Sequence, residues 1–292
     1  MARDLSLSPP IGIIAYSDFY DLPERRVWGD YWLKENLAGE FVKLGYPVDH
    51  SRPGILLHLF GEPVRDLPSD TYNILWIHSH PDWITPGILG KYRKIYCISE
   101  HFTKKITGMG FDAETMMIPT NMTPLNMRKL YDIVFVGNTK RNLARKIIRD
   151  MGIIPYNIKI WGWGWRGLVP DEWFAGDYYE NRKLNQLYAA SKIILNDHHE
   201  DMRREGFLNP RVLDGLASGG FVISDNVPGM NELLDNSVIT YETPAELRGL
   251  IEKYLNDDSG RASLTKKGAR AALKYTYTAS CLKIISHIKG IV

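Results

Sequence analysis

Short apolar runs alternate along the whole chain with segments whose apolar residues recur at the spacing of one helix face. Ile11–Tyr16, Ile55–Phe60 and Tyr72–His78 are apolar runs of strand length. Tyr31–Leu44 instead has the periodicity of a helix, and Gly45 follows it as a candidate C-cap. Strand, loop and helix in this repeated order predict α/β units.

The same alternation resumes after Pro119–Arg128, a polar segment with Pro and Asn residues that predicts a linker between two domains. Asp132–Val136 and Asn157–Trp161 begin the second series of strands. The sequence therefore predicts an α/β fold with two Rossmann-like domains, residues 1–124 and 125–271, whose parallel sheets face a central cleft.

The segment Glu205–Glu232 predicts a short helix over Arg211–Ser218, then two glycines, an apolar strand and a turn. Arg211 and Asp214 lie three residues apart, so both can project from one face of the first helical turns. A helix N-terminus attracts anions, so an arginine for phosphate and a carboxylate for ribose hydroxyls would suit a nucleoside diphosphate. A plain crossover of an α/β sheet is the alternative interpretation.

Two polar residues, His80 and Asp82, follow the strand predicted at Tyr72–His78. Ligands of open parallel sheets bind beyond the carboxyl ends of the strands, so these residues lie where an active-site loop would be. We interpret them as candidate catalytic residues, with an ordinary surface loop as the alternative.

Gly29 and Asp30 stand directly before the first predicted helix. Backbone N–H groups at such a position can be presented to a ligand. The alternative is that Gly29 forms a turn and Asp30 is the N-cap of the helix.

A loop with a glycine and two basic residues joins the strand at 132–136 to the next predicted helix. Its candidate ligand-binding residues are Gly137, Asn138, Lys140 and Arg141, and the two basic side chains can cradle a diphosphate. The G-x-x-x-x-G-K pattern of a P-loop is absent. A solvated basic start of a helix is the alternative.

The strand at Asn157–Trp161 leads into a loop rich in glycine and tryptophan. Gly162 lets the backbone approach a flat ligand and Trp163 could form a wall of its site, or the tryptophans could pack between the domains. A second polar cluster lies at 196–201, where His198 and His199 are adjacent and do not easily share one tetrahedral ion, so no metal site is predicted.

Composition excludes several classes of protein. The 292 residues carry a formal net charge of +2, which gives no reason to expect binding to nucleic acid or to an anionic membrane. Cys97 and Cys281 are far apart and do not suggest a disulfide framework. No signal peptide or transmembrane span is apparent, so we expect a cytoplasmic protein.

A longer pattern runs through the segment Glu205–Glu232 and adds a family resemblance. It consists, in chain order, of Gly206, Phe207, Asn209, Arg211, Leu213, Asp214, Gly215, Ala217, Gly219, Gly229, Glu232 and Leu233. This pattern resembles the donor site of GT-B glycosyltransferases of the group 1, or family-four-like, set, and most closely that of CgeB-like, spore-maturation-type glycosyltransferases. It departs from the family-four pattern because Asp214 replaces the second glutamate and one extra residue separates it from Glu205.

The resemblance implies a GT-B fold whose C-terminal helix, here about residues 272–292, packs back on the first domain. It also implies that the basic loop after Gly137 faces the donor phosphates, and that the Gly162 loop lies near the nucleotide base. Tyr178 would then form the other side of the base pocket. It adds Glu205 as a further catalytic candidate and assigns the first domain, with Gly29 and Asp30, to the acceptor.

The expected activity is transfer of a sugar from a nucleotide-diphosphate sugar to an acceptor such as a glycan or a cell-surface polysaccharide precursor. The nucleotide sugar is a co-substrate, and neither a metal ion nor a resident cofactor is expected. Two alternatives come from other classes, because a fold does not fix a function. They are a nucleotide-sugar epimerase of GT-B fold and a non-catalytic spore-coat-type binding module.

Overall fold

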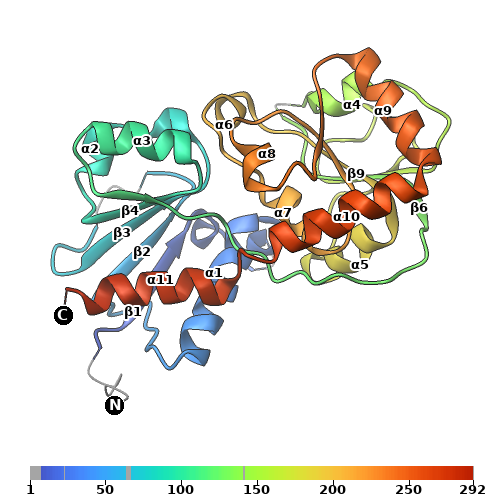
Figure 1. Ribbon diagram of the computed structural model, residues 1–292. Helices are drawn as coiled ribbons and strands as arrows, with labels where there is room; N and C mark the ends of the chain where they lie inside the picture. The colour runs from blue at the N-terminus through green and yellow to red at the C-terminus, as the bar shows by residue number, and fades with distance from the viewer. Residues whose placement is uncertain (1–7, 23, 64–66, 141, 292) are drawn as a thin grey trace. The chain divides into compact units, whose positions relative to one another are not determined.

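The structure is a computed structural model that describes residues 8–22, 24–63, 67–140 and 142–291 (Figure 1). The chain divides into two compact units. Unit 1 comprises Met1–Pro119, Glu200–Phe207 and Tyr275–Val292, and unit 2 comprises Thr120–His199 and Leu208–Lys274. The split after Pro119 falls within the predicted linker, and the chain passes between the units again on both sides of 200–207 and after Lys274.

Unit 1 contains a sheet of five parallel strands whose spatial order follows the sequence. The strands are β1 (Ile11–Ala15), β2 (Ile55–Phe60), β3 (Tyr72–Ile77), β4 (Lys94–Cys97) and β5 (Ala113–Thr115). A single parallel bridge joins Val48 to Ile11 on the side of β1 that does not pair with β2. The strand order therefore reverses at β1, and ligands of such sheets bind at the carboxyl ends next to this reversal.

Helices cover both faces of the unit 1 sheet. In Figure 1, α1 (Gly29–Lys43) and α11 (Tyr277–Lys289) lie below the sheet and α3 (Glu100–Gly108) lies above it. Unit 1 also contains two shorter helices, α2 (Pro86–Leu89) and α6 (Glu200–Arg204). Right-handed crossovers explain this arrangement, because the chain moves in opposite directions from the two sides of the reversal.

The last helix, α11, is joined to α1 by polar and apolar contacts. Thr276 caps α11 by accepting a hydrogen bond from the Ala279 amide, and the buried residues that follow recur every three or four positions. The Sγ atom of Cys281 lies 3.8 Å from the carbonyl oxygen of Leu37, and the Asn36 side chain donates to the Tyr277 hydroxyl. The end of the chain is therefore part of the core of unit 1.

Unit 2 contains a sheet of six parallel strands in the order β11-β10-β9-β6-β7-β8. Its strands are β6 (Tyr131–Val136), β7 (Ile158–Trp161), β8 (Phe174–Gly176), β9 (Ser191–Asn196), β10 (Val222–Asp225) and β11 (Ile239–Tyr241). The first strand of the unit, β6, stands beside the fourth, β9, which is the order of a Rossmann fold. The switch point of this sheet lies between β6 and β9.

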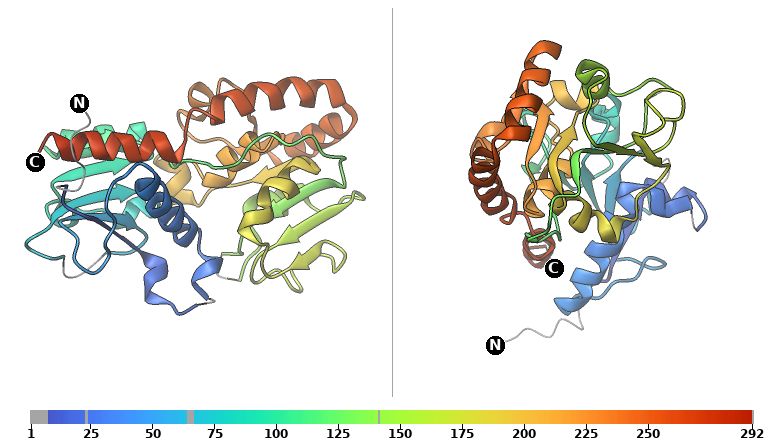
Figure 2. Two further views of the ribbon diagram at one scale, coloured as in Figure 1. Left: turned by 90° about the horizontal axis from the view of Figure 1, so that it is seen from below. Right: turned by 90° about the vertical axis from the view of Figure 1, so that its right-hand side faces the viewer.

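The helices of unit 2 also divide between the two faces of its sheet. In Figure 1, α4 (Lys146–Met151) and α9 (Pro244–Asn256) lie together on one face, and α5 (Leu184–Ala189), α7 (Pro210–Ala217) and α10 (Asp258–Ala272) lie on the other; Figure 2 gives two further views. One short helix, α8 (Met230–Leu233), follows β10. The predicted α/β fold with two parallel sheets is confirmed.

Two loops at the carboxyl ends of β6 and β7 are bonded together through their backbones. The Gly137 amide donates to the Trp161 carbonyl at 2.8 Å, and the indole of the fully buried Trp165 donates to the Gly137 carbonyl at 2.7 Å. A Cβ atom on Gly162, whose φ is +139°, would lie 2.2 Å from the Gly137 carbonyl oxygen. Only glycine permits this approach at position 162.

We expect the substitution Gly162→Ala to lower the free energy of unfolding by about 2–4 kcal/mol, because the added methyl group collides with backbone and the backbone conformation disfavours alanine. Gly249→Ala is the control, since a Cβ on this glycine of α9 meets no atom within 4 Å. That variant should gain about 0.5–1 kcal/mol. Chemical denaturation followed by tryptophan fluorescence measures both, and equal stability of the two variants would contradict the packing described.

Candidate functional site

The candidate site of unit 2 lies at the carboxyl ends of β6, β9 and β10, beside the switch point of the sheet. Gly137 follows β6 directly, and Asn196 and Asp225 are the last residues of β9 and β10. Helix α7 begins close to them and contributes Arg211 in its first turn. The arrangement collects polar groups at the edge of the sheet where open α/β folds bind ligands.

Arg211 is held by hydrogen bonds to its side chain and to its backbone. Its Nη1 donates to Asn196 Oδ1 at 2.6 Å, and its guanidinium group lies over the Phe135 ring, 5.0 Å from the ring centroid. Its amide donates to the side chain of Asn209, the N-cap of α7, at 2.9 Å. A Cβ on Gly137 would lie 2.6 Å from Nη2 of Arg211, so the glycine leaves the space that the guanidinium occupies.

The residues that fix Asn196 and Asn209 were not predicted from the sequence. Asn196 Nδ2 donates to the Ser224 hydroxyl at 2.9 Å, and this hydroxyl donates to Asp225 Oδ1 at 3.0 Å. His198 joins the other branch, because its Nδ1 lies 2.6 Å from the same carboxylate oxygen and its Nε2 accepts from the Asn209 amide at 2.9 Å. The residues joined by these hydrogen bonds lie up to 28 positions apart in the chain, so only the fold brings them together.

A second arginine stands beside Arg211. Arg145 is buried and pairs with the buried Asp197, its Nη2 lying 2.6 Å from Oδ1 of the carboxylate. Burial lowers the pKa of Arg211, and the nearby charge of Arg145 acts in the same direction. Two guanidinium groups near the carboxyl ends of parallel strands make this part of the site suited to an anion.

Asp214 is one turn beyond Arg211 in α7 and faces the segment that enters unit 2. Its Oδ1 accepts a hydrogen bond from the Thr120 hydroxyl at 2.7 Å. The surrounding protein raises the pKa of the Asp214 carboxyl to about 6 by desolvation, although the Thr120 hydrogen bond and the Arg211 charge oppose the shift. A carboxyl group whose pKa is raised in this way is often found at a ligand site.

The other residues predicted for the donor lie in the loops after β6, β7 and β8. Asn138 Oδ1 accepts from the Trp163 amide at 2.9 Å, and the Trp163 side chain is 51% exposed. Lys140 is exposed, and Arg141 lies outside the described residues. Tyr178 is 41% exposed, and its hydroxyl accepts from the Asn181 amide. Gly137, Asn138 and Gly162 thus hold the two loops together, and Trp163 and Tyr178 present exposed rings.

The predicted catalytic residues His80, Asp82 and Glu205 all belong to unit 1. His80 has left-handed backbone geometry with φ 51°, and its ring stacks on Trp83 at a centroid distance of 4.2 Å. Asp82 forms an ion pair with Arg204 of α6. His80 and Asp82 follow the carboxyl end of β3, on the side of the sheet where ligands bind.

Glu205 is a buried carboxylate with two cationic partners. Its Oε2 lies 2.5 Å from the Lys105 ammonium, and its Oε1 accepts from Arg204 Nε at 3.1 Å. Burial alone would raise the pKa of Glu205, but the hydrogen bonds from Lys105 and Arg204 outweigh it, so the pKa is lowered. The side chain is therefore an ionised member of a charge network.

Gly29 and Asp30 lie in the first turn of α1, whose N-cap is Trp28, so the alternative that Asp30 is the N-cap is wrong. Asp30 Oδ2 instead accepts from the Ser17 amide at 3.0 Å, beyond the end of β1. Burial raises the pKa of the Asp30 carboxyl, against the effect of this hydrogen bond. A Cβ on Gly29 would meet no atom within 4 Å.

The polar cluster at 196–201 contributes Asn196, Asp197 and His198 to the candidate site. Among the residues with described positions, no group of three or more His, Cys, Asp or Glu side chains is arranged to hold a metal ion. Nowhere in the described ranges does a helix have the length and apolar character needed to cross a membrane.

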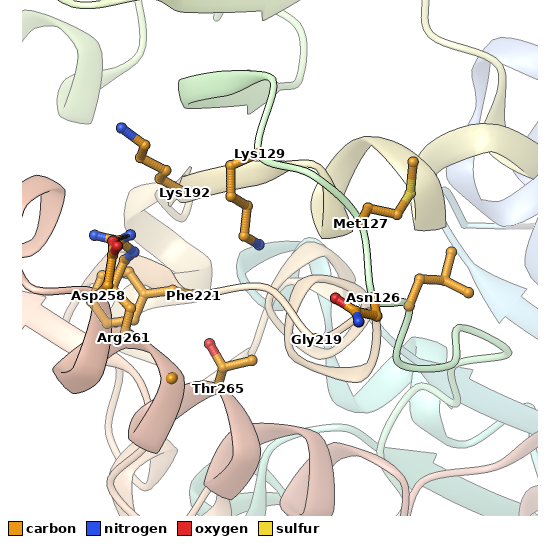
Figure 3. Close-up of a pocket in the computed structure, with 11 residues that line it drawn as sticks. Asn126, Met127, Lys129, Lys192, Gly219, Phe221, Asp258, Arg261 and Thr265 are labelled. Carbon is orange, nitrogen blue, oxygen red and sulfur yellow. Dashed lines mark hydrogen bonds and ion pairs between the residues drawn. The ribbon is translucent and has the colours of Figure 1, made fainter.

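A pocket of 310 Å³ lies at the amino ends of the unit 2 strands, opposite the candidate site at their carboxyl ends (Figure 3). It is lined by Lys129, which precedes β6, by Lys192 near the start of β9, and by Phe221, which precedes β10, with Arg261 and Thr265 of α10. Lys192 pairs with Asp132 and Arg261 with Asp258. This pocket shares no lining residue with the candidate site.

Comparison with known proteins adds a family and a set of structural neighbours. A family model described as glycosyl transferase-like matches residues 139–285, half of the chain. No curated protein sequence matches the chain.

The structural neighbours are glycosyltransferases of GT-B fold. AviGT4, a glycosyltransferase involved in avilamycin A biosynthesis, is 14% identical with a TM-score of 0.65, over 96% of this chain and 97% of its own. T4 phage BGT in complex with UDP and Mn²⁺ is 10% identical with a TM-score of 0.65, over 96% and 99%. Anabaena Alr3699/HepE in complex with UDP and glucose is 9% identical with a TM-score of 0.64, over 98% and 100%. At these identities the likeness shows the fold, and the predicted GT-B fold is confirmed.

The carboxyl group of Asp214 should titrate with a midpoint of about 6 in a ¹³C NMR titration, with Asp214→Asn identifying its resonance. Since the folded pKa lies above the ordinary 3.8, this group lowers the free energy of unfolding as the pH rises from 3.8 to about 6. The isosteric change Thr120→Val removes a hydrogen bond that holds the pKa down, so the midpoint should rise further. A midpoint near 3.8 in the wild type would contradict the environment described.

Proposed function

The chain belongs to the glycosyl transferase-like family and is a glycosyltransferase, and we propose that it transfers a sugar from a nucleoside diphosphate sugar to a hydroxyl group of an acceptor. The observation that carries this proposal is the position of Arg211. Its guanidinium group is held beside the switch point of unit 2, where Gly137 leaves it room and Asn209 caps its helix. Arg211 would bind the diphosphate, and Asp214 would bind the ribose.

The reaction requires a stabilised leaving group. The bond between the anomeric carbon and the β-phosphate oxygen breaks, and its electron pair leaves with the diphosphate. The acceptor oxygen bonds to the anomeric carbon and loses its proton. A fixed guanidinium and the N-terminus of α7 are suited to the charge that develops on the diphosphate, so the proposal assigns this role to the protein without a metal ion.

Other features support the nature of the donor. T4 phage BGT and Anabaena Alr3699/HepE were solved with UDP, which makes UDP the first nucleotide to test here. The exposed rings of Trp163 and Tyr178 follow β7 and β8 and would contact the base. Asn138 and Gly162 would support this pocket by holding its loops, while Lys140 and Arg141 would add positive charge near the phosphates.

Unit 1 would bind the acceptor, which we propose to be a glycan or a polysaccharide precursor. Gly29, Asp30, His80 and Asp82 follow the carboxyl ends of its strands or begin its first helix. His80 or Asp82 would take the acceptor proton if the reaction inverts the anomeric configuration. Glu205 would act through its charge network, because two cations already engage its carboxylate. The motif around Arg211 further supports a place in the CgeB-like subgroup.

The experiment that tests the donor is a thermal-shift screen with UDP, GDP, ADP, CDP and dTDP and their sugars, run in EDTA. A ligand that binds the folded state raises the melting temperature by mass action. At least one diphosphate should do so in EDTA if the protein binds it without metal. Stabilisation by none of them, with or without added Mn²⁺, would defeat the proposal.

We expect Arg211→Ala to weaken UDP binding about tenfold to a hundredfold, because a charge-assisted contact with phosphate is worth roughly 1.5–3 kcal/mol. Uridine, which has no phosphate, should lose far less affinity, whereas Asp214→Asn should weaken both ligands. Arg261→Ala is a matched control, since it removes a buried guanidinium near the amino ends of the strands of the same sheet. Calorimetry measures the affinity of each of the three variants for UDP and for uridine. Unchanged UDP affinity in Arg211→Ala would move the phosphate site to Lys140 and Arg141.

If the reaction inverts the anomeric configuration with His80 as the base, His80→Ala should lower turnover about a hundredfold or more and leave UDP affinity nearly unchanged. His287→Ala is the control, because His287 contacts the Tyr72 hydroxyl at the amino end of β3, away from the proposed acceptor site. Steady-state rates and UDP calorimetry separate the two effects. An equal loss of UDP affinity in His80→Ala would assign His80 to the donor and defeat the proposed role.

A further inference from the structure

The hydrogen bonds around Arg211 form a closed ring that returns to the same residue. One branch starts at its side chain and runs through Asn196 and Ser224 to Asp225. The other starts at its backbone amide and runs through Asn209 and His198 to Asp225. Both branches end on the same atom, Oδ1 of Asp225.

The directions of these bonds are fixed by chemistry. The backbone N–H of Asn209 can only donate, so Nε2 of His198 accepts this hydrogen bond. The proton of the His198 imidazole is therefore on Nδ1, which donates to Asp225. Guanidinium groups also only donate, so Oδ1 of Asn196 accepts from Arg211 and Nδ2 donates to Ser224. The Ser224 hydroxyl is then free to donate to Asp225. Each member has one orientation, and the orientations agree around the ring.

Four of the six members of the ring are shielded from water. Asn196 and Ser224 have no exposed surface, and Asp225 and His198 are 6% and 7% exposed. Water cannot easily replace a bond that is lost in such a place, so the loss of one member disturbs its neighbours. Asp225 is further tied to the loop because its Oδ2 accepts from the His198 amide at 3.1 Å.

We infer that His198 and Asp225 are positioning residues for donor binding, which act by holding the Arg211 guanidinium and the N-terminus of α7 in one fixed relation. The inference rests on the proposed role of Arg211 in binding the diphosphate. Neither residue needs to touch the donor. Asp225 couples the two groups because it is the acceptor at which the side-chain branch and the backbone branch meet.

The variants that test this inference separate the two bonds of His198. His198→Gln places an amide oxygen near the position of Nε2 and keeps an acceptor for the Asn209 amide, whereas His198→Asn keeps only the donor to Asp225. UDP and inorganic pyrophosphate should bind His198→Asn and Asp225→Asn about threefold to tenfold more weakly than the wild type. His198→Gln, which loses the bond to Asp225 instead of the bond to Asn209, should bind both ligands more weakly by a similar factor, and uridine should bind all variants within about twofold.

Ser191→Ala is the matched control, because it removes a buried hydroxyl that donates to the Leu187 carbonyl at 2.6 Å at the other end of β9. It should bind UDP and pyrophosphate as the wild type does. A residue that acts through Arg211 should have little further effect once Arg211 is gone, so the double variant His198→Asn with Arg211→Ala should bind UDP as Arg211→Ala alone does. Full affinity of His198→Asn, or additive losses in the double variant, would overturn the inference.

A crystal structure of His198→Asn without ligand separates this inference from the proposed function. If Arg211→Ala binds UDP normally, the proposed phosphate site fails, but the ring still predicts that the Arg211 guanidinium or the Asn209 cap moves in His198→Asn. Wild-type positions of both groups in that structure would overturn the positioning role. Displacement of either group would support it whatever the diphosphate contacts.

Discussion

Holding a guanidinium group at the carboxyl ends of parallel strands is the constraint on which unit 2 depends. A cation removed from water needs hydrogen-bond acceptors and favourable neighbours, and the protein supplies an amide oxygen from Asn196 and the face of Phe135. Gly137 meets the accompanying steric requirement, because any side chain there would collide with the guanidinium. The loops after β6 and β7 then approach each other closely, which requires Gly162 in turn.

The carboxylates of Asp197 and Asp225, which lie near Arg211, are both bound by other side chains. Asp197 pairs with Arg145, and Asp225 accepts from Ser224 and His198. Asp214 differs from them, because burial raises the pKa of its carboxyl group and its Oδ1 accepts from a neutral partner, the Thr120 hydroxyl. The two arginines, with Asp197 paired to one of them, favour an anion close to α7.

The fold could be predicted because it depends on local patterns. Ile55–Phe60 was predicted as a strand with the bounds that β2 has, and the helix predicted at Tyr31–Leu44 corresponds to α1, which begins two residues earlier and ends one residue earlier. The strand β8 was missed because its three residues include a glycine and carry no apolar run.

The site was less accessible to sequence reasoning, because its polar contacts join distant residues. Arg211 and Asp214 stood out by their spacing on one helix, but His198 drew notice only as half of a histidine pair. Its bonds to Asp225 and to the Asn209 amide depend on where two loops meet. Glu205 was a candidate only through the family resemblance, and nothing in the sequence links it to Lys105, which lies 100 residues earlier.

The pairing of α11 with α1 has a consequence for how the protein is made. Leu37 and Phe41 are fully buried, and α11, which packs beside α1, is synthesised some 240 residues later. During translation the face of α1 that packs against α11 therefore stays uncovered until α11 has been synthesised, whereas every strand of unit 2 can already pair. Sequence-distant contacts of this kind slow folding and leave a nascent intermediate exposed to aggregation. Unit 1, although it contains the N-terminal strands, is completed last.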